Sequence, residues 1–166
     1  MKDKDITIEI EENVLNIRAA VIINHENKVL MHRDVLSDHY ALVGGRVKLG
    51  ENSSETVKRE VKEEIGKEIE IKGYIATVEN FFNMKNKKYH EILFVYQGEF
   101  TNERDKKITE TLKNIEGEKE LQYEWIEIDE LNKYPIKPES IIEVLQKQKY
   151  PVHVINNDIN KKKEMI

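Results

Sequence analysis

The sequence contains no cysteine. This absence excludes disulfide bonds, zinc sites built on cysteine and a cysteine nucleophile. The chain also lacks any run near the roughly 18 apolar residues of a membrane-spanning helix, and its charged first residues lack the apolar core of a secretory signal. We therefore expect a cytoplasmic protein that has no membrane partner.

An excess of positive charge is also missing. The 27 Lys and Arg residues are outnumbered by 32 Asp and Glu residues, which gives a net charge of -5. No global field therefore favours duplex nucleic acid or an anionic membrane. A substrate that carries phosphate would need local cations or metal ions.

Apolar residues make up 39% of the chain and charged residues 36%. They occur in periodic runs, which is typical of a globular protein rather than a disordered one. A length of 166 residues fits one domain. We expect a single domain over residues 1–166, with a frayed segment from about residue 151.

Alternating apolar and polar residues predict most of the strands. We expect a strand at 6–10, a hairpin of strands 17–23 and 28–32 joined by a turn at 24–27, and a short strand before two glycines. Two long strands, 69–82 and 89–100, should flank a polar loop at 83–88. A strand at 121–128 changes its apolar phase near Trp125, which suggests a bulge there.

Two helices complete the expected fold. The first spans about 53–65, because Asn52 and Glu55 form a capping-box pattern at its start and Gly66 is placed to end it. The second begins near Pro138 and Ser140. Strands, helix, strands and helix in this order predict an α+β domain, in which a mixed β-sheet lies between helices.

The first helix concentrates negative charge. At about 100° per residue, Glu60, Glu63 and Glu64 share one patch, which lies beside an apolar stripe that begins at Val57. Glutamates four residues apart repel each other by about 0.2–0.5 kcal/mol. A solvated helix face would explain such a charge run. A second explanation is a site for Mg²⁺ or Mn²⁺, which bind carboxylates and phosphate oxygens alike.

The wider pattern resembles the MutT-like signature of the Nudix hydrolase family. It covers 22 residues and contains every charged and glycine position of that signature. Lys67 departs from the usual aliphatic residue after the signature, and Val43 replaces a common proline. The matching positions are Gly45, Glu51, Arg59, Glu60, Val61, Glu63, Glu64 and Gly66.

The resemblance implies a chemistry. Nudix enzymes use water and Mg²⁺ or Mn²⁺ to hydrolyse a phosphoanhydride in a nucleoside diphosphate linked to another group. It also implies roles for residues of this chain. Metal ligands would be Glu60, Glu64, Glu63 and the carbonyl of Gly44, and Glu51, Arg59 and Gly45 would position them.

The resemblance leaves the general base open, because family members place it among the helix glutamates or on a later loop. The catalytic set is therefore Glu60, Glu63 and Arg59, with Glu118 or Glu120 as loop candidates. Arg46 is a candidate for phosphate binding. Phe82 is a candidate for stacking on a nucleobase, and the alternative is a place in the sheet core.

Two other functions deserve comparison. A catalytically inactive Nudix-fold module that binds nucleotides or regulates a partner would keep the fold without hydrolysis. The isomerase branch of the fold uses a cysteine, which this chain lacks. Nucleoside triphosphates and nucleotide sugars both remain open as substrates. The resemblance also suggests a homodimer, because many family members pair.

Overall fold

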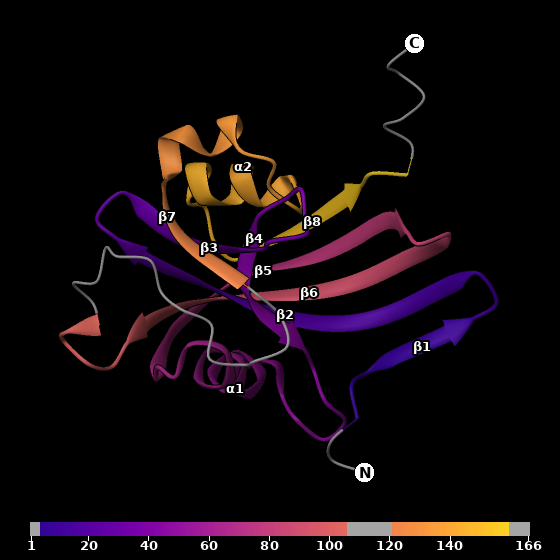
Figure 1. Ribbon diagram of the computed structural model, residues 1–166, viewed down its shortest axis with the longest axis horizontal. Coiled ribbons are helices and arrows are strands. Elements are labelled where there is room, and N and C mark those ends of the chain that lie inside the picture. The colour runs from indigo at the N-terminus through magenta and orange to yellow at the C-terminus, as the bar shows by residue number, and fades with distance from the viewer. Residues whose placement is uncertain (1–3, 106–120, 160–166) are drawn as a thin grey trace.

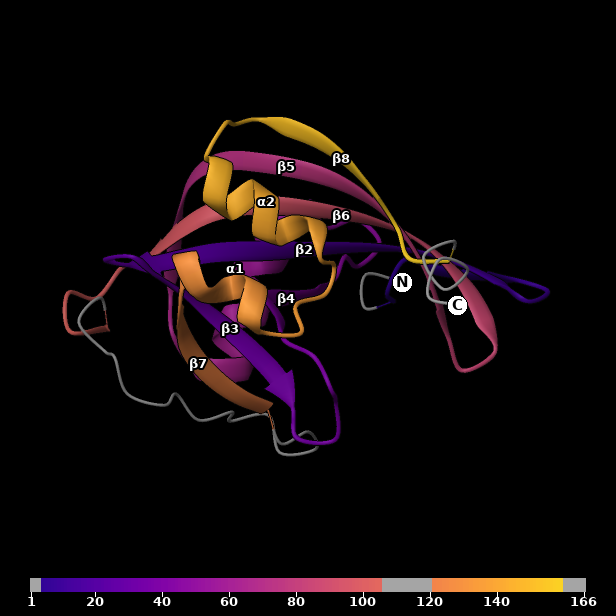
Figure 2. The ribbon, with the colours of Figure 1, turned by 90° about the horizontal axis from the view of Figure 1, so that it is seen from above.

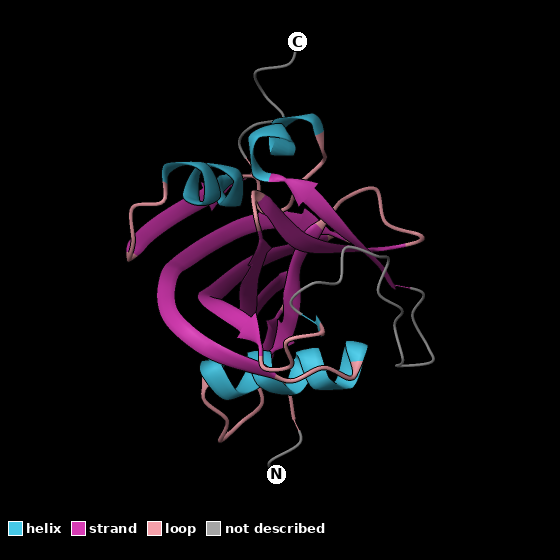
Figure 3. Ribbon diagram, turned by 90° about the vertical axis from the view of Figure 1, so that its left-hand side faces the viewer, coloured by secondary structure: helices cyan, strands magenta, loops and turns pink. Residues whose placement is uncertain are grey.

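The computed structural model describes residues 4–105 and 121–159. Within these ranges one mixed sheet lies between α1 on one face and α2 on the other (Figures 1 and 3). This architecture confirms the predicted α+β class. The elements are β1 Thr7–Ile10, β2 Asn13–His25, β3 Lys28–Asp34, β4 Ala41–Arg46, α1 Ser53–Ile65, β5 Ile69–Met84, β6 Lys87–Phe100, β7 Leu121–Glu127, the 3₁₀-helix η2 Ile128–Lys133, α2 Ser140–Lys147 and β8 Val152–Asn157.

The sheet order is β7-β3-β4-β2-β6-β5-β8, and β1 pairs with β2 outside this path. β2 runs parallel to β6 and β5 runs parallel to β8, whereas the other neighbours are antiparallel. Parallel neighbours need long connections. The chain between β2 and β6 contains α1, and the chain between β5 and β8 contains α2.

The predicted hairpin of β2 and β3 is correct only at its turn. Asn24 pairs with Val29 and His25 with Lys28. Beyond this point β2 pairs with β4 and β6, while β3 pairs with β7 and briefly with β4. The two strands therefore separate into different parts of the sheet.

The expected polar loop at 83–88 is wrong. β5 and β6 pair up to Met84 and Lys87, so the connection consists of Lys85 and Asn86 alone. Both have positive φ, 49° and 63°. Two such residues form the turn whose twist matches antiparallel strands. The polar composition of residues 83–88 therefore suggested a loop where the chain forms a tight hairpin.

The expected bulge near Trp125 is also wrong. β7 pairs with β3 without interruption from Leu121 to Glu127. Tyr123 is buried in the core beneath α1, and Ile126 is buried in the core beneath α2. Both faces of this strand are covered, so apolar residues occur at both phases of the alternation.

The segment that was expected to fray from about residue 151 contains β8. Val152–Asn157 pair in parallel with Ala76–Phe81 of β5. Figure 2 shows β8 as the outer strand of the sheet, beside β5. Tertiary pairing therefore orders a segment whose composition suggested fraying.

Two hydrophobic cores lie on the two faces of the sheet. Helix α1 contributes Val57, Val61 and Ile65, which are at most 5% exposed, to one of them. Full burial of each side chain stabilises the fold by about 1.5–3 kcal/mol. The α2 core occupies the other face. No helix in the described ranges has the length and apolar character to cross a membrane.

Candidate active site

Helix α1 begins and ends as the sequence predicts. The Asn52 side chain accepts a hydrogen bond from the Glu55 backbone N–H, and the Glu55 side chain accepts one from the Asn52 N–H. Gly66 follows the helix with a φ of 68°. These caps fix the register in which α1 presents its glutamates.

Arg59 is the centre of the site. Its Nε and Nη2 donate to the two carboxylate oxygens of Glu51 at 2.7 and 3.0 Å. Its Nη1 donates to Glu60 at 2.7 Å and to Glu63 at 3.0 Å. Nη2 also donates to the backbone carbonyl of Arg46 at 3.0 Å. One guanidinium thus ties α1 to the loop before it and to the end of β4.

Glu51 is the best-anchored carboxylate. Besides Arg59, the Thr56 hydroxyl donates to it at 2.8 Å and the Lys48 N–H at 3.2 Å. Burial alone would raise its pKa, but the hydrogen bonds from Arg59, Thr56 and Lys48 outweigh burial and lower the pKa to about 2. The hydrogen bond to Glu51 also raises the pKa of Arg59.

Replacing Glu51 with Gln is expected to lower the free energy of unfolding at neutral pH by about 2 kcal/mol. The folded pKa lies below the ordinary value of 4.5. The stabilisation is therefore complete above that value and is lost as pH falls toward about 2. Urea unfolding of both proteins at several pH values measures the difference, which should shrink with acidification.

The control for Glu51 is Glu68→Gln. The Glu68 side chain is 71% exposed and pairs only with Lys62 among the contacts described. Its removal should change the stability by less than about 1 kcal/mol. A loss in Glu51→Gln that is independent of pH would contradict the assignment of this stabilisation to the charged carboxylate.

Glu60 lies against a glycine backbone. A Cβ atom on Gly45 would lie 2.2 Å from Cδ of Glu60, so only glycine allows this approach. The Glu60 side chain is 14% exposed. Burial raises its pKa, and the charges of Glu64 and Glu63 add to this effect while Arg59 opposes it. An additional cation would therefore be favoured here.

Glu64 turns into the protein. Its side chain is 8% exposed, against 38% for Glu63. The hydroxyl of Tyr123 in β7 donates to Glu64 Oε2 at 2.9 Å. Nδ1 of His32 in β3 lies 3.6 Å from the same oxygen. The acidic patch thus extends from solvent at Glu63 to the core at Glu64.

The family of the chain is shown by comparison with known proteins. The sequence pattern of the NUDIX domain matches residues 15–147. The chain belongs to the NUDIX family. No curated protein sequence matches it.

Several solved structures share the fold. A MutT NUDIX hydrolase from Burkholderia pseudomallei is 19% identical with a TM-score of 0.64, and the match covers 81% of this chain and 98% of that one. A UDP-X diphosphatase is 18% identical with a TM-score of 0.61, covering 84% and 66%. An ADP-ribose pyrophosphatase from Streptococcus suis is 13% identical with a TM-score of 0.60, covering 84% and 98%.

Helix α1, called the NUDIX helix below, carries carboxylate oxygens of the kind that a hard divalent cation binds. One carboxylate oxygen accepts no hydrogen bond from the described residues in each of Glu60, Glu63 and Glu64. The described residues contain no preassembled cluster of three or more metal-binding side chains. Arg59 draws Glu60 and Glu63 toward itself instead. The three glutamates fit a divalent cation by donor chemistry, because each has one carboxylate oxygen that the contacts with Arg59 and Tyr123 do not use.

Other predicted residues lie in different places. Gly44 is in β4, where a Cβ atom would lie 2.1 Å from the backbone oxygen of Ala19. The Arg46 side chain points to Asp5 at 3.7 Å, while its carbonyl meets Arg59. Glu118 and Glu120 lie outside the described residues.

Phe82 lies on the sheet face opposite α1. It shares the alternation of Val78, which belongs to the α2 core, and its ring stacks on Tyr89 with centroids 4.9 Å apart. The structure thus separates Phe82 from the glutamates of the NUDIX helix. Its role in stacking on a nucleobase stays a prediction.

The departure at Lys67 has a structural explanation. Its ammonium donates to Asp105 at 2.7 Å, and Asp105 is only 8% exposed. An aliphatic residue would leave this carboxylate without that donor. Lys67 therefore links the end of α1 to the chain that follows β6.

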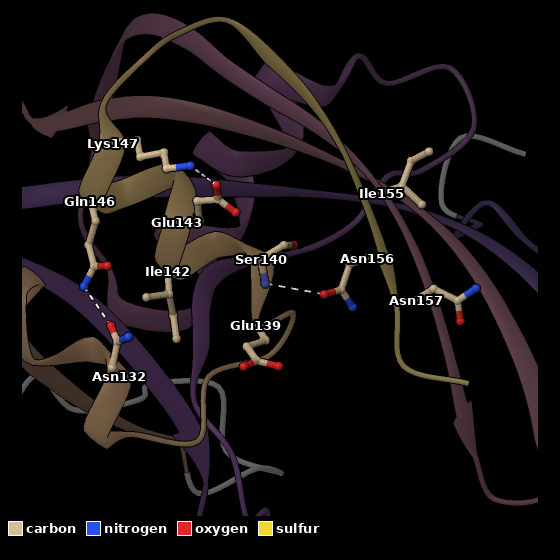
Figure 4. Close-up of a pocket in the computed structure, with 10 residues that line it drawn as sticks. All are labelled: Asn132, Glu139, Ser140, Ile142, Glu143, Gln146, Lys147, Ile155, Asn156 and Asn157. Atoms are coloured by element: carbon tan, nitrogen blue, oxygen red, sulfur yellow. Dashed lines mark hydrogen bonds and ion pairs between the residues drawn. The ribbon is translucent and has the colours of Figure 1, made fainter. Parts of the chain in front are cut away.

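A hollow of about 420 Å³ lies between α2 and β8 (Figure 4). Its lining includes Asn132, Ser140, Gln146 and Asn156. None of the predicted site residues lines it, and it is on the face of the sheet opposite α1. The NUDIX carboxylates therefore define the candidate site, and this hollow does not.

Three side chains of the site escaped the sequence analysis. They are Thr56, which supports Glu51, and the pair Tyr123 and His32 beside Glu64. The alternation around Tyr123 does show that it faces inward. No sequence signal places Tyr123 against Glu64 of α1, because the two residues are 59 positions apart in the chain.

Proposed function

We propose that this protein is a metal-dependent hydrolase of phosphoanhydride bonds in a nucleoside diphosphate linked to another group. Water is the nucleophile, and Mg²⁺ or Mn²⁺ is the cofactor. Family membership supports hydrolysis of nucleotide derivatives in general terms. The narrower proposal depends on the site itself.

The observation that carries the proposal is the set of ion pairs that Arg59 makes. One guanidinium holds Glu51, Glu60 and Glu63 within 3.0 Å of its nitrogens. A binding module has no need to keep Glu60, Glu63 and Glu64 on one face of α1, because their mutual repulsion destabilises the helix. A hydrolase needs this concentration of negative charge to bind divalent cations near a diphosphate.

The residues would divide the work as follows. Glu60 and Glu64 hold the cation, with Glu63 and the Gly44 carbonyl as further ligands. When bound, the cation neutralises phosphate charge and lowers the pKa of water. Glu51 orients Arg59, and Arg59 in turn orients Glu60 and Glu63. A carboxylate of the helix, or Glu118 or Glu120, accepts the proton of the attacking water.

The substrate class is tested by a panel with Mg²⁺ or Mn²⁺. The named neighbours suggest UDP derivatives and ADP-ribose. The panel also includes the nucleoside triphosphates and nucleotide sugars that the sequence leaves open. We expect nucleoside monophosphate release from at least one compound, and its loss with EDTA. Binding without product across the panel would instead favour the inactive module.

Two narrower statements from the sequence stay predictions: a cytoplasmic location and a homodimer. Analytical ultracentrifugation of the purified chain tests the second.

A further inference from the structure

Glu64 is the most buried carboxylate of the candidate metal site. The whole residue is 6% exposed, and it is one of the few buried charged residues of the described chain. A buried carboxylate destabilises the fold unless donors satisfy it. The orientation of Glu64 is therefore set by what lies inside the protein, not by solvent.

The polar side chains that face Glu64 come from two adjacent strands. Tyr123 of β7 and His32 of β3 are direct register partners, and their ring centroids lie 5.8 Å apart. Tyr123 is 2% exposed and donates its hydroxyl to Glu64 Oε2 at 2.9 Å. This cross-strand pair forms a buried wall beside the carboxylate.

His32 adds a second polar atom to this wall. Its Nδ1 is buried and has no hydrogen-bond partner among the described residues. It lies 3.6 Å from Glu64 Oε2, beyond normal hydrogen-bond distance. Both polar groups of the wall therefore face the same oxygen, Oε2.

We propose that Tyr123 and His32 are positioning residues: they hold Oε2 of Glu64 inside the protein, so that Oε1 would remain available to hold a divalent cation. The proposal rests on the proposed function only in taking Glu64 as a metal ligand. Partners that orient a ligating carboxylate typically change metal affinity by 10–100-fold. Neither residue needs to contact the substrate.

The test measures Mn²⁺ binding to the protein without nucleotide, from the electron paramagnetic resonance signal of free Mn²⁺. We expect Tyr123→Phe to raise the Kd about tenfold, and His32→Asn to raise it about threefold. Glu64→Gln should raise it most. Turnover of Tyr123→Phe should recover at saturating Mn²⁺, because only the metal affinity has changed.

Tyr40→Phe is the matched control. Tyr40 is also buried, at 9% exposure, and it donates to a glutamate, Glu124 Oε2, at 2.8 Å. Glu124 follows Tyr123 in β7 but is not part of the acidic patch. Tyr40→Phe should lose similar stability and keep the wild-type Kd. A purely structural role of Tyr123 would leave the Kd of both variants unchanged.

The outcomes separate clearly. Unchanged Mn²⁺ affinity in Tyr123→Phe and His32→Asn overturns the proposal, as does a wild-type protein that binds no Mn²⁺. If Tyr123→Phe does not fold, His32→Asn decides. Since the titration contains no nucleotide, a negative substrate panel with the expected Kd values would overturn only the proposed function.

Discussion

Glu60→Gln is expected to lower kcat/KM by about a thousandfold while the protein remains folded. The loss of one ligating charge removes several kcal/mol of transition-state stabilisation, and each 1.36 kcal/mol changes the rate about tenfold. Steady-state kinetics with the substrate identified in the panel, at saturating Mg²⁺, measure the change in kcat/KM. Thermal unfolding of the same variant checks the fold.

Stability should respond in the opposite sense. Glu60 is buried beside Glu63 and Glu64, and burial raises its pKa. Neutralising it therefore removes a cost at neutral pH, so Glu60→Gln should be at least as stable as the wild type. The control is Glu68→Gln, which lies outside the patch and should keep its activity. A Glu60→Gln protein with full turnover would refute the proposed role.

Alanine at Gly45 and at Gly44 should produce different losses. A Cβ atom on Gly45 would lie 2.2 Å from Cδ of Glu60, the mobile end of a side chain. The carboxylate must move away, and a displacement of about 1 Å can reduce the rate about a hundredfold. We therefore expect Gly45→Ala to lose activity but little stability.

Gly44→Ala should instead lose stability. Its Cβ atom would lie 2.1 Å from the backbone oxygen of Ala19, and a backbone cannot turn aside. Overpacking of this kind costs about 3 kcal/mol. Urea unfolding measures this loss, and kcat/KM measures the effect at Gly45.

Gly73→Ala is the control for both glycine variants. A Cβ atom on Gly73 meets nothing within 4 Å. It should therefore change neither stability nor activity by much. Equal stability losses at Gly44 and Gly45 would contradict the distinction between a backbone contact and a side-chain contact.

The sequence predicted the parts of the site that lie within one continuous stretch. Asn52, Glu55 and Gly66 define the ends of α1 through contacts three or four residues apart. The same spacing predicts that Glu60, Glu63 and Glu64 share a patch. The role of Arg59 came from resemblance to the family. The structure shows its ion pairs with Glu51, Glu60 and Glu63, and the role itself stays a prediction.

The sequence predicted less where polar composition conflicts with tertiary pairing. The segment 83–88 is polar, yet it forms a hairpin because Lys85 and Asn86 adopt positive φ. Val152–Asn157 are followed by a charged terminus, yet they pair with β5. Backbone hydrogen bonds to a neighbouring strand do not depend on apolar periodicity alone.

By itself the sequence determined the α+β class, the boundaries of α1 with their capping residues, and the acidic face of that helix. All of these follow from residues a few positions apart, because a helix converts short spacing into a shared face. Only the tertiary structure decided that Tyr123 and His32 meet Glu64, and that Phe82 lies on the other side of the sheet. Strand pairing joins residues far apart in the chain, and one residue of register selects the face on which each side chain lies.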